Sequence, residues 1–232
     1  MNYFVTGTDT GVGKTLVCCS LLHAFAARNN KVAGMKPVAA GCAENDVNDD
    51  VKELRKATNI LASLGQINPY SFLHPIAPHI AARNSGVQIN LERILESYNE
   101  LASQADVVIV EGAGGFLVPL NETQDIADLV ETLGIPLIVV VGIRLGCLNH
   151  ALLTQQAINT RGLECAGWVA NILQPDMSAL DENIQSLQQR ISAPLLGIIQ
   201  YQSPADPRLI ANQINLDLLT EEPSIIQTTA EN

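Results

Sequence analysis

A glycine-rich turn lies between an apolar run and a helical stretch near the start of the chain. The apolar run covers residues 3–6, and the turn that follows is Gly7-Thr8-Asp9-Thr10-Gly11-Val12-Gly13-Lys14-Thr15. Such loops bind phosphate because successive backbone N–H groups, together with the positive end of the following helix, point at it. The lysine reaches the outer phosphates, and the hydroxyl that follows it binds Mg²⁺. The turn therefore predicts a site for ATP or a related nucleoside triphosphate.

The loop departs in one respect from the usual pattern, which is Gly-x-x-x-x-Gly-Lys followed by Ser or Thr. Gly7 stands one position too early, and Thr8 occupies the place of the first glycine. A chance glycine-rich turn is the alternative interpretation, but a strand before the loop and a helix after it supply the required context. We expect the phosphates to be bound by Gly11, Val12, Gly13, Lys14, Thr15 and Leu16.

The rest of the chain alternates short apolar runs with longer helical stretches. We expect strands at residues 3–6, 32–36, 106–111, 136–141, 166–171 and 195–199. Helices are expected at residues 14–28, 90–103, 125–134, 148–161 and 178–192. Continuous apolar strands that alternate with helices are typical of a mostly parallel sheet covered on both faces. The chain is therefore predicted to be one α/β domain of the P-loop NTPase type over residues 1–232, with a flexible tail at residues 220–232.

Composition narrows the functional classes. A hydrophobic content of 47% with 16% charged residues indicates a folded globular protein. The net charge of −11 argues against a nucleic-acid binder, which needs clustered lysine and arginine. The longest apolar run, at residues 137–141, is too short to cross a membrane, and the N-terminus lacks the basic region of a signal peptide. The five cysteines have no metal-ligand spacing, so we expect reduced thiols and a cytoplasmic protein.

Polar residues follow the expected strands at the edge where parallel sheets bind ligands. Lys36 ends the second strand, where its charge would balance an anionic substrate or the γ-phosphate; a solvated surface lysine is the alternative. Glu111 ends a later strand, as a carboxylate that holds Mg²⁺ does; otherwise it caps the turn at residues 112–115. A further metal ligand is expected from an acidic loop that contains Glu44, Asp46, Asp49 and Asp50. Spacing alone does not choose among these four.

Seven short motifs connect the chain to a known enzyme family. They lie at residues 3–10 with 12–15, 36–39, 68–70, 78–80, 110–115, 145–151 and 166–171, and they read YFVTGTDT with VGKT, KPVA, NPY, PHI, VEGAGG, LGCLNHA and AGWVAN. In these motifs the chain resembles the dethiobiotin synthetase family, from its start to about residue 200. The family's own threonine at position 8 accounts for the irregular glycine spacing of the loop.

The resemblance implies an ATP- and Mg²⁺-dependent ligase of biotin biosynthesis. Its substrates are 7,8-diaminononanoate, CO₂ and ATP. One amine captures CO₂ as a carbamate, ATP phosphorylates the carbamate to a carbamic–phosphoric anhydride, and the second amine closes the cyclic urea. Dethiobiotin, ADP and phosphate are the products. For such chemistry the protein mainly positions the reactants and neutralises charge.

The resemblance also implies catalytic and metal-binding roles. The catalytic residues would be Thr10, Lys14 and Lys36. The metal ligands would be Thr15, Asp50 and Glu111. Asp50 is taken from the acidic loop because the family's aspartate precedes the helix, which we expect to begin at Val51.

Further residues are assigned to the nucleotide and to the amine substrate by the same resemblance. Asn171 would read the adenine base, and the remaining nucleotide contacts would be Gly112, Ala113, Gly114, Gln200, Tyr201 and Gln202, together with Asp50 and Glu111. The family is a homodimer with the amine substrate at its interface. There the backbone at a helix start would receive the substrate carboxylate from the partner subunit. The substrate residues would be Ala40, Cys147, Leu148 and Asn149.

Three positions depart from the family's pattern. Ala40 replaces a serine, Gly11 replaces an acidic residue, and the base loop at residues 199–201 reads IQY where the family usually has Ile-Pro-Trp. These departures indicate either tuning or a paralogue with a related substrate. The choice between ATP and CTP stays open.

Three other functions compete with the ligase. A partition or septum-positioning ATPase, which is a binding switch, has a second lysine near the start of the loop, where this chain has Asp9. An amidotransferase ATPase domain would need a long glutaminase extension, whereas the chain ends at Asn232. A paralogue that only binds nucleotide would not be expected to retain Lys14, Thr15, Lys36 and Glu111.

Overall fold

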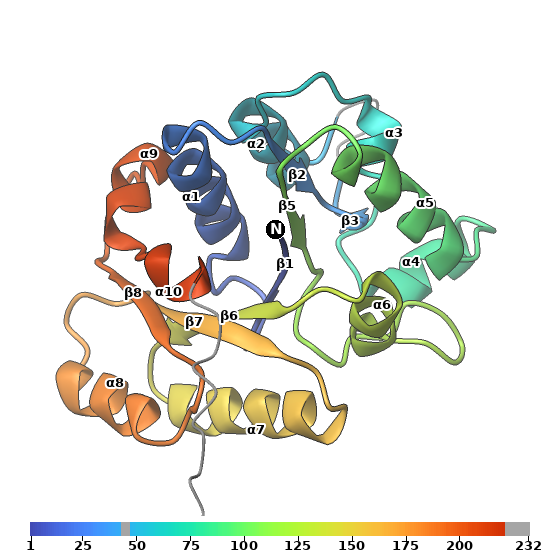
Figure 1. Ribbon diagram of the computed structural model, residues 1–232. Coiled ribbons are helices and arrows are strands. Elements are labelled where there is room, and N and C mark those ends of the chain that lie inside the picture. The colour runs from blue at the N-terminus through green and yellow to red at the C-terminus, as the bar shows by residue number, and fades with distance from the viewer. Residues whose placement is uncertain (43–46, 221–232) are drawn as a thin grey trace, which may run out of the picture.

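The central feature of the fold is a parallel sheet (Figure 1). The structure is a computed structural model, which describes residues 1–42 and 47–220. Within these residues the sheet has six strands in the order β2-β5-β1-β6-β7-β8. The strands are β1 (Asn2–Gly7), β2 (Val32–Met35), β5 (Val107–Glu111), β6 (Leu137–Ile143), β7 (Cys165–Ile172) and β8 (Leu195–Ile199). All pairings between these neighbours are parallel. The predicted fold class is confirmed, and each expected strand exists.

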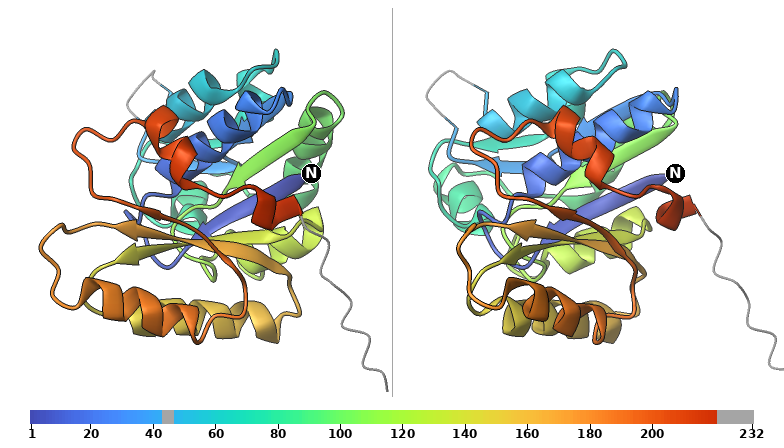
Figure 2. Two further views of the ribbon diagram at one scale, coloured as in Figure 1. Left: turned by 60° about the vertical axis from the view of Figure 1, so that its left-hand side comes forward. Right: turned by 90° about the vertical axis from the view of Figure 1, so that its left-hand side faces the viewer.

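Helices cover both faces of the sheet. One face carries α1 (Lys14–Ala27), α2 (Asp49–Ala57), α9 (Pro207–Ile210), η1 (Ala211–Gln213) and α10 (Asp217–Thr220). The other face carries α4 (Pro78–Asn84), α5 (Leu91–Ala102), α6 (Ile126–Leu133), α7 (Cys147–Thr160) and α8 (Leu180–Gln188). Figure 2 shows α1 and α9 on the side of the sheet opposite to α7 and α8. Alternation along β1 explains this arrangement, because Phe4 packs into one hydrophobic cluster and Val5 into the other.

A second, two-stranded parallel sheet is not predicted from the sequence. It pairs β3 (Val38–Ala40) with β4 (Tyr70–Phe72), and α3 (Leu64–Ile67) precedes β4. Three-residue strands are too short to show an alternating pattern of apolar residues, so they carry no periodic signal. This small sheet lies after β2, and its strand β3 borders the same space as the phosphate loop.

The start of α2 corrects another expectation. The helix begins at Asp49 rather than at Val51. Asn48 is its N-cap and accepts a hydrogen bond from the Asp50 N–H, so the chain enters the helix earlier than the apolar pattern indicates. Glu44 and Asp46, and all of the expected tail beyond residue 220, lie outside the described residues. Within the described residues, no helix is both long and apolar enough to span a bilayer.

Register in the sheet brings the strand ends together. Val5 of β1 pairs with Glu111 of β5, and Met35 of β2 pairs with Val110. Lys36 directly follows β2, and the phosphate loop directly follows β1. Lys36, Glu111 and the loop therefore meet at one edge of the sheet, as expected for the carboxyl ends of parallel strands.

Candidate active site

The loop between β1 and α1 has the backbone that close phosphate approach requires. Gly11 and Gly13 have φ angles of 74° and 92°, which residues with a side chain rarely adopt. A Cβ atom on Gly13 would also overlap the amide nitrogen of Asn171. Helix α1 then begins at Lys14, so its N-terminus points into the loop. The strand–loop–helix unit thus matches the geometry of a phosphate-binding site.

A cavity of ≈ 750 Å³ opens beside this loop. Its volume lies in the range of small-molecule sites. Most of the predicted catalytic, metal and phosphate residues line it: Thr10, Gly11, Gly13, Lys14, Thr15, Lys36, Ala40, Asp50, Glu111, Ala113 and Gly114. The fold therefore gathers the predicted residues from four separate segments of the chain around one space.

Lys36 is buried at the wall of this cavity. Its Nζ lies 2.5 Å from Glu111 Oε1, 3.0 Å from Asp50 Oδ2 and 3.3 Å from the carbonyl oxygen of Gly112. An ammonium has three protons, and these three acceptors match them. Burial alone would lower the pKa of Lys36, but the two carboxylates raise it above its ordinary value. The alternative of a solvated surface lysine is wrong, and Lys36 keeps its positive charge in the cavity.

The Thr15 hydroxyl joins the same group of oxygens. Its Oγ1 lies 2.8 Å from Asp50 Oδ1 and 2.8 Å from Glu111 Oε1. A hydroxyl carries one proton, so it cannot donate to both carboxylates at once. Among the described residues, Glu111 Oε2 is buried and has no hydrogen-bond partner. This cluster has more acceptor oxygens than protons, which is the donor set that a hard cation such as Mg²⁺ prefers.

The two carboxylates differ in their environment. Burial raises the pKa of Glu111, and the Lys36 ammonium offsets only part of this effect. Burial also acts to raise the pKa of Asp50, but Lys36 and the Thr15 hydroxyl together lower it below its ordinary value. Oε1 of Glu111 bonds Lys36 and Thr15 within the described residues, so the carboxylate does not cap the turn at residues 112–115.

The structure distinguishes the two adjacent aspartates of the acidic loop. The Asp50 side chain is 42% exposed and contacts Lys36 and Thr15, whereas the Asp49 side chain is 95% exposed and pairs with Lys52. Asn48 sets this difference, because its cap fixes which residue of the first turn faces the cavity. Asn48 also lines the cavity, and its Nδ2 donates to the Ala40 carbonyl. The sequence analysis does not predict Asn48 as part of the site. The signal that could have indicated it is a residue type that caps helices, two positions before a candidate carboxylate.

Asp9 organises the phosphate loop from within. Its carbonyl oxygen accepts from Lys14 Nζ at 2.9 Å, and its Oδ1 accepts from the Thr10 N–H at 2.7 Å. Arg144, which follows β6, places Nη2 2.5 Å from Asp9 Oδ2. Burial lowers the pKa of Lys14, and the nearby positive charge of Lys36 lowers it further. Sequence reasoning uses Asp9 to exclude another protein class but assigns it no role in the loop.

An apolar wall of the cavity is also not predicted as part of the site. It consists of Val38, Ala39, Pro75, Ile76, Ala77, Pro78 and Val118. Ala40 continues this wall on β3. Val38, Ala39 and Pro78 do lie in the motifs at residues 36–39 and 78–80, which is the signal that points to them. The lining of the cavity therefore combines charged and apolar residues.

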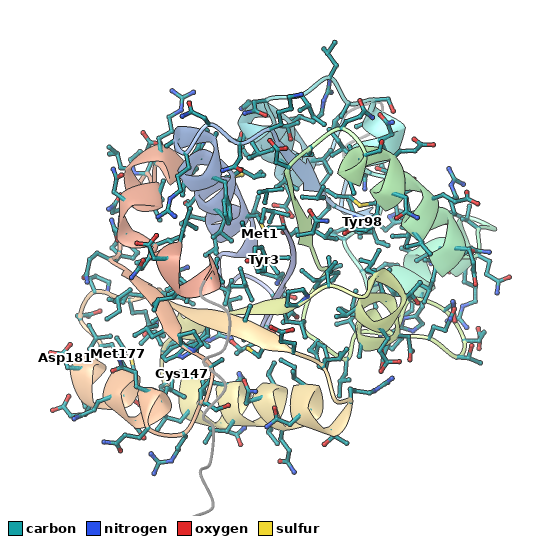
Figure 3. All side chains as sticks on the ribbon, viewed as in Figure 1. Met1, Tyr3, Tyr98, Cys147, Met177 and Asp181 are labelled. Carbon is teal, nitrogen blue, oxygen red and sulfur yellow. The ribbon has the colours of Figure 1, made fainter. Side chains whose placement is uncertain are left out.

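Several predicted residues do not line the cavity. They are Val12, Leu16, Gly112, Cys147, Leu148, Asn149, Asn171, Gln200, Tyr201 and Gln202. Asn171 is buried, and its Nδ2 donates to the Val12 carbonyl at 2.8 Å, so part of its amide holds the phosphate loop. Cys147, labelled in Figure 3, is the first residue of α7, so residues 147–149 do form a helix start. The base-reading and carboxylate-binding roles stay predictions.

Comparisons with known proteins place the chain among close relatives. A family model described as an AAA domain matches residues 1–208. An ATP-dependent dethiobiotin synthetase of Nitrosospira multiformis is 54% identical over 214 residues, which are 92% of this chain and 94% of that protein. Enzymes of the same name from Aromatoleum aromaticum and Xanthomonas oryzae pv. oryzae are 50% and 45% identical, each over 92% of this chain and over 96% and 97% of their own lengths.

Solved structures with a similar fold include a cell division protein and a ParA family ATPase. The MinD cell division protein of Aquifex aeolicus has a TM-score of 0.56 and 13% identity, over 96% of this chain and 98% of that one. A ParA family ATPase from Chlorobium tepidum has a TM-score of 0.53 and 17% identity, over 95% of this chain and 92% of that one. At these identities the likeness concerns the fold alone. It concerns the arrangement of the sheet and its helices and does not bear on the reaction.

Proposed function

The chain belongs to the ATP-dependent dethiobiotin synthetase family and is an ATP-dependent ligase of biotin biosynthesis; from this premise we propose how its cavity closes the urea ring. The observation that carries the proposal is the buried Lys36 ammonium, which lies between two carboxylates and beside the phosphate loop. A fixed positive charge at this position suits a reaction in which a carbamate oxygen attacks the γ-phosphorus. Lys14 and Lys36 would hold the γ-phosphate and the carbamate, and Thr10 would contact both.

The reaction proceeds in three steps. One amine of 7,8-diaminononanoate adds to CO₂ and loses a proton, which gives a carbamate. A carbamate oxygen then forms a bond to the γ-phosphorus of ATP, and ADP leaves. Finally the second amine attacks the carbonyl carbon of the carbamic–phosphoric anhydride and loses a proton to solvent, phosphate leaves with the electron pair of the broken C–O bond, and the five-membered urea ring closes. Lys36 would stabilise the negative charge that these steps concentrate on the carbamate and phosphate oxygens.

A magnesium ion fits the oxygen cluster, and Thr15, Asp50 and Glu111 would hold it. The fit is supported by the orphaned Oε2 of Glu111 and by the single Thr15 proton facing two carboxylates. When bound, the ion would neutralise phosphate charge. The protein's own part is to keep Asp50 ionised, which the lowered pKa of its carboxyl supports.

The apolar wall would receive the hydrocarbon chain of the amine substrate. Val38, Ala39 and Ala40 lie on β3 shortly after Lys36, and Ile76 and Pro78 line the same cavity. Methylene groups gain about 0.8 kcal/mol each when they leave water for such a surface. The Ala40 side chain offers a methyl group there and no hydrogen bond. The hydrocarbon part of the substrate would therefore be held by apolar contact rather than by a polar group.

Diamine-dependent ADP release tests the proposed function. Purified protein is mixed with ATP, Mg²⁺ and bicarbonate, with and without 7,8-diaminononanoate. We expect ADP to form rapidly only with the diamine, together with a product of the mass of dethiobiotin. An ADP release rate that the diamine does not raise would refute the assignment and favour a nucleotide-binding paralogue.

The lowered pKa of Lys14 predicts that ATP affinity begins to fall at a lower pH than it would with an ordinary lysine. Lys14 attracts phosphate only while it is protonated, and its pKa lies below the ordinary lysine value of about 10.4. Lys36 keeps its proton, because its pKa is raised. The affinity for ATP is measured by calorimetry from about pH 7.5 to about pH 10. Above the pKa of Lys14, we expect this affinity to fall by up to about tenfold for each pH unit. In Lys14→Arg, which stays charged, the decline should disappear; an equal slope in both proteins would contradict the prediction.

We also propose that the protein is a homodimer in which α7 of one subunit borders the cavity of the other. Residues 147–149 form a helix start but do not line the cavity of their own chain, which supports a role toward a partner. Leu117, Leu145 and Leu153 are exposed, and Leu145 and Leu153 lie near that helix start or on α7 itself.

Free thiols at all five cysteines, which lie within the described residues, support the cytoplasm as the location.

Leu145→Asp tests the dimer. Wild-type protein should sediment at about twice the chain mass of 24.9 kDa. The charge should produce monomers and raise the KM for the diamine, because a charge at an apolar interface is unfavourable. Leu61, which is as exposed as Leu145 but lies before α3, gives the matched control Leu61→Asp, which should remain a dimer. A wild-type monomer with full activity would exclude the shared site.

A further inference from the structure

Two dipeptides that end in proline run side by side beneath the cavity. Lys36-Pro37 connects β2 to β3, and Asn68-Pro69 connects α3 to β4. The pairing of Val38 with Tyr70 in the small sheet brings these connections together. Proline has no N–H, so neither Pro37 nor Pro69 can donate a backbone hydrogen bond here. The backbone next to Lys36 therefore needs donors from elsewhere.

Asn68 supplies these donors from its side chain. Its Nδ2 lies 2.7 Å from the Lys36 carbonyl oxygen and 2.9 Å from the Tyr70 carbonyl oxygen, and the residue is buried. An amide nitrogen has two hydrogens, so both are used. The Lys36 N–H in turn donates to the Ile67 carbonyl at 2.8 Å. Residues 67 and 68 thus bind both backbone polar groups of Lys36.

The segment that holds Lys36 is itself fixed to α5. The Tyr70 hydroxyl accepts a hydrogen bond from the Asn90 N–H at 3.0 Å, and Asn90 is the N-cap of α5. The guanidinium of Arg93 lies 5.0 Å from the centre of the Tyr70 ring, within the range of a cation–π contact. The Tyr70 N–H also donates to the Pro37 carbonyl at 3.1 Å. A continuous set of contacts therefore runs from α5 through Tyr70 and Asn68 to Lys36.

The backbone of Lys36 determines where its ammonium can reach. From this fixed peptide, Nζ makes contacts to Glu111, Asp50 and the Gly112 carbonyl that use all three of its protons. A displaced backbone would have to lengthen at least one of these contacts. We propose that Asn68 is a positioning residue for ring closure, which acts through Lys36 by holding its peptide with a buried amide. This inference rests on the proposed role of Lys36 in the reaction.

Substitution of Asn68 tests this inference by its separate effects on turnover and binding. Asn68→Ala removes both donors, and Asn68→Ser keeps one short donor. A displacement of about 1 Å can lower a rate about 100-fold, so we expect kcat to fall about 10- to 100-fold in the alanine variant and less in the serine variant. The KM for ATP should stay within about twofold of the wild-type value, because both Asn68 donors go to the Lys36 and Tyr70 carbonyls and not to the phosphate loop.

A matched control comes from another asparagine with the same chemistry. Asn121 Nδ2 donates to the Ile89 carbonyl at 3.0 Å and to Gln124 Oε1 at 2.8 Å, outside the cavity beside the loop. Asn121→Ala should keep the wild-type kcat per folded protein. If it loses as much kcat as Asn68→Ala, a general structural effect explains both variants and the inference is wrong.

A double-mutant cycle with Lys36→Gln decides between positioning and general structural damage. If Asn68 acts through Lys36, Asn68→Ala should lower kcat little further in the Lys36→Gln background, measured at raised enzyme concentration. An equal fold-loss in both backgrounds would overturn the inference. Asn68→Ser replaces the alanine variant in the cycle if the latter does not fold. Failure of the proposed function is distinct, because it would appear in the wild-type protein as ADP release that the diamine does not raise.

Discussion

Lys36→Gln should lose most of its turnover while it still binds ATP. The Lys36 ammonium is buried, keeps its charge and lies where γ-phosphate and carbamate oxygens would meet. Removal of one fixed donor to a developing negative charge typically lowers kcat about 10²- to 10³-fold. Phosphate binding by the loop does not require Lys36, so the Kd for ATP, measured by calorimetry, should change little. Near-normal turnover would remove Lys36 from the catalytic residues.

The same substitution has a second expected effect, on stability. Glutamine leaves the buried Glu111 without its cation, and removal of one partner from a buried ion pair costs about 3–5 kcal/mol. Turnover must therefore be expressed per folded protein, from a thermal unfolding curve taken under the assay conditions. Lys56→Gln is the matched control, because Lys56 pairs with Glu53 on the exposed surface of α2 and should alter neither kcat nor stability by much.

Lys36 and Glu111 could be predicted from the sequence because the physics that places them is local. Lys36 directly follows β2 and Glu111 ends β5, and parallel strands bring such positions to one edge of the sheet. The phosphate loop is recognisable for a similar reason, since its glycines, lysine and threonine are adjacent in the chain. The main sheet and its long helices are also predictable, because apolar runs of four residues or more between turn residues indicate strands, and apolar residues at helical spacing indicate helices.

Other parts of the site depend on contacts between distant segments, which one sequence does not contain. The apolar wall combines β3 with residues 75–78, and β3 itself is too short to show a pattern. Asn171 lies near the end of β7, within the predicted strand, yet tertiary packing turns its amide toward the Val12 carbonyl. Asn68 is visible in the sequence only as part of a motif. Its role becomes apparent when the two proline dipeptides are seen together.

The acidic loop tests whether the structure identifies a site residue that the sequence spacing leaves open, because it contains two adjacent aspartates. Asp50→Asn should lower kcat/KM about 100-fold and raise the Mg²⁺ concentration needed for half-maximal rate about 10- to 100-fold, as loss of a metal-site group commonly does. The neutral amide keeps the shape of the side chain but loses the charge that attracts Lys36 and a cation. Asp49→Asn is the matched control. Its side chain is 95% exposed and directed away from the cluster, so rate and Mg²⁺ dependence should stay within about twofold.

Acid unfolding gives an independent measure of the same carboxylate. Lys36 and the Thr15 hydroxyl hold the pKa of Asp50 below its ordinary value in the folded protein. Ionised Asp50 therefore stabilises the folded protein fully at pH values above the pKa of an unfolded-state aspartate, which is about 3.9. This stabilisation is lost as the pH falls through the lower folded-state pKa. The free energy of unfolding should therefore decline less steeply below about pH 4 in Asp50→Asn than in Asp49→Asn. Equal slopes, together with equal Mg²⁺ dependence, would show that Asp50 neither pairs with Lys36 nor serves the metal site.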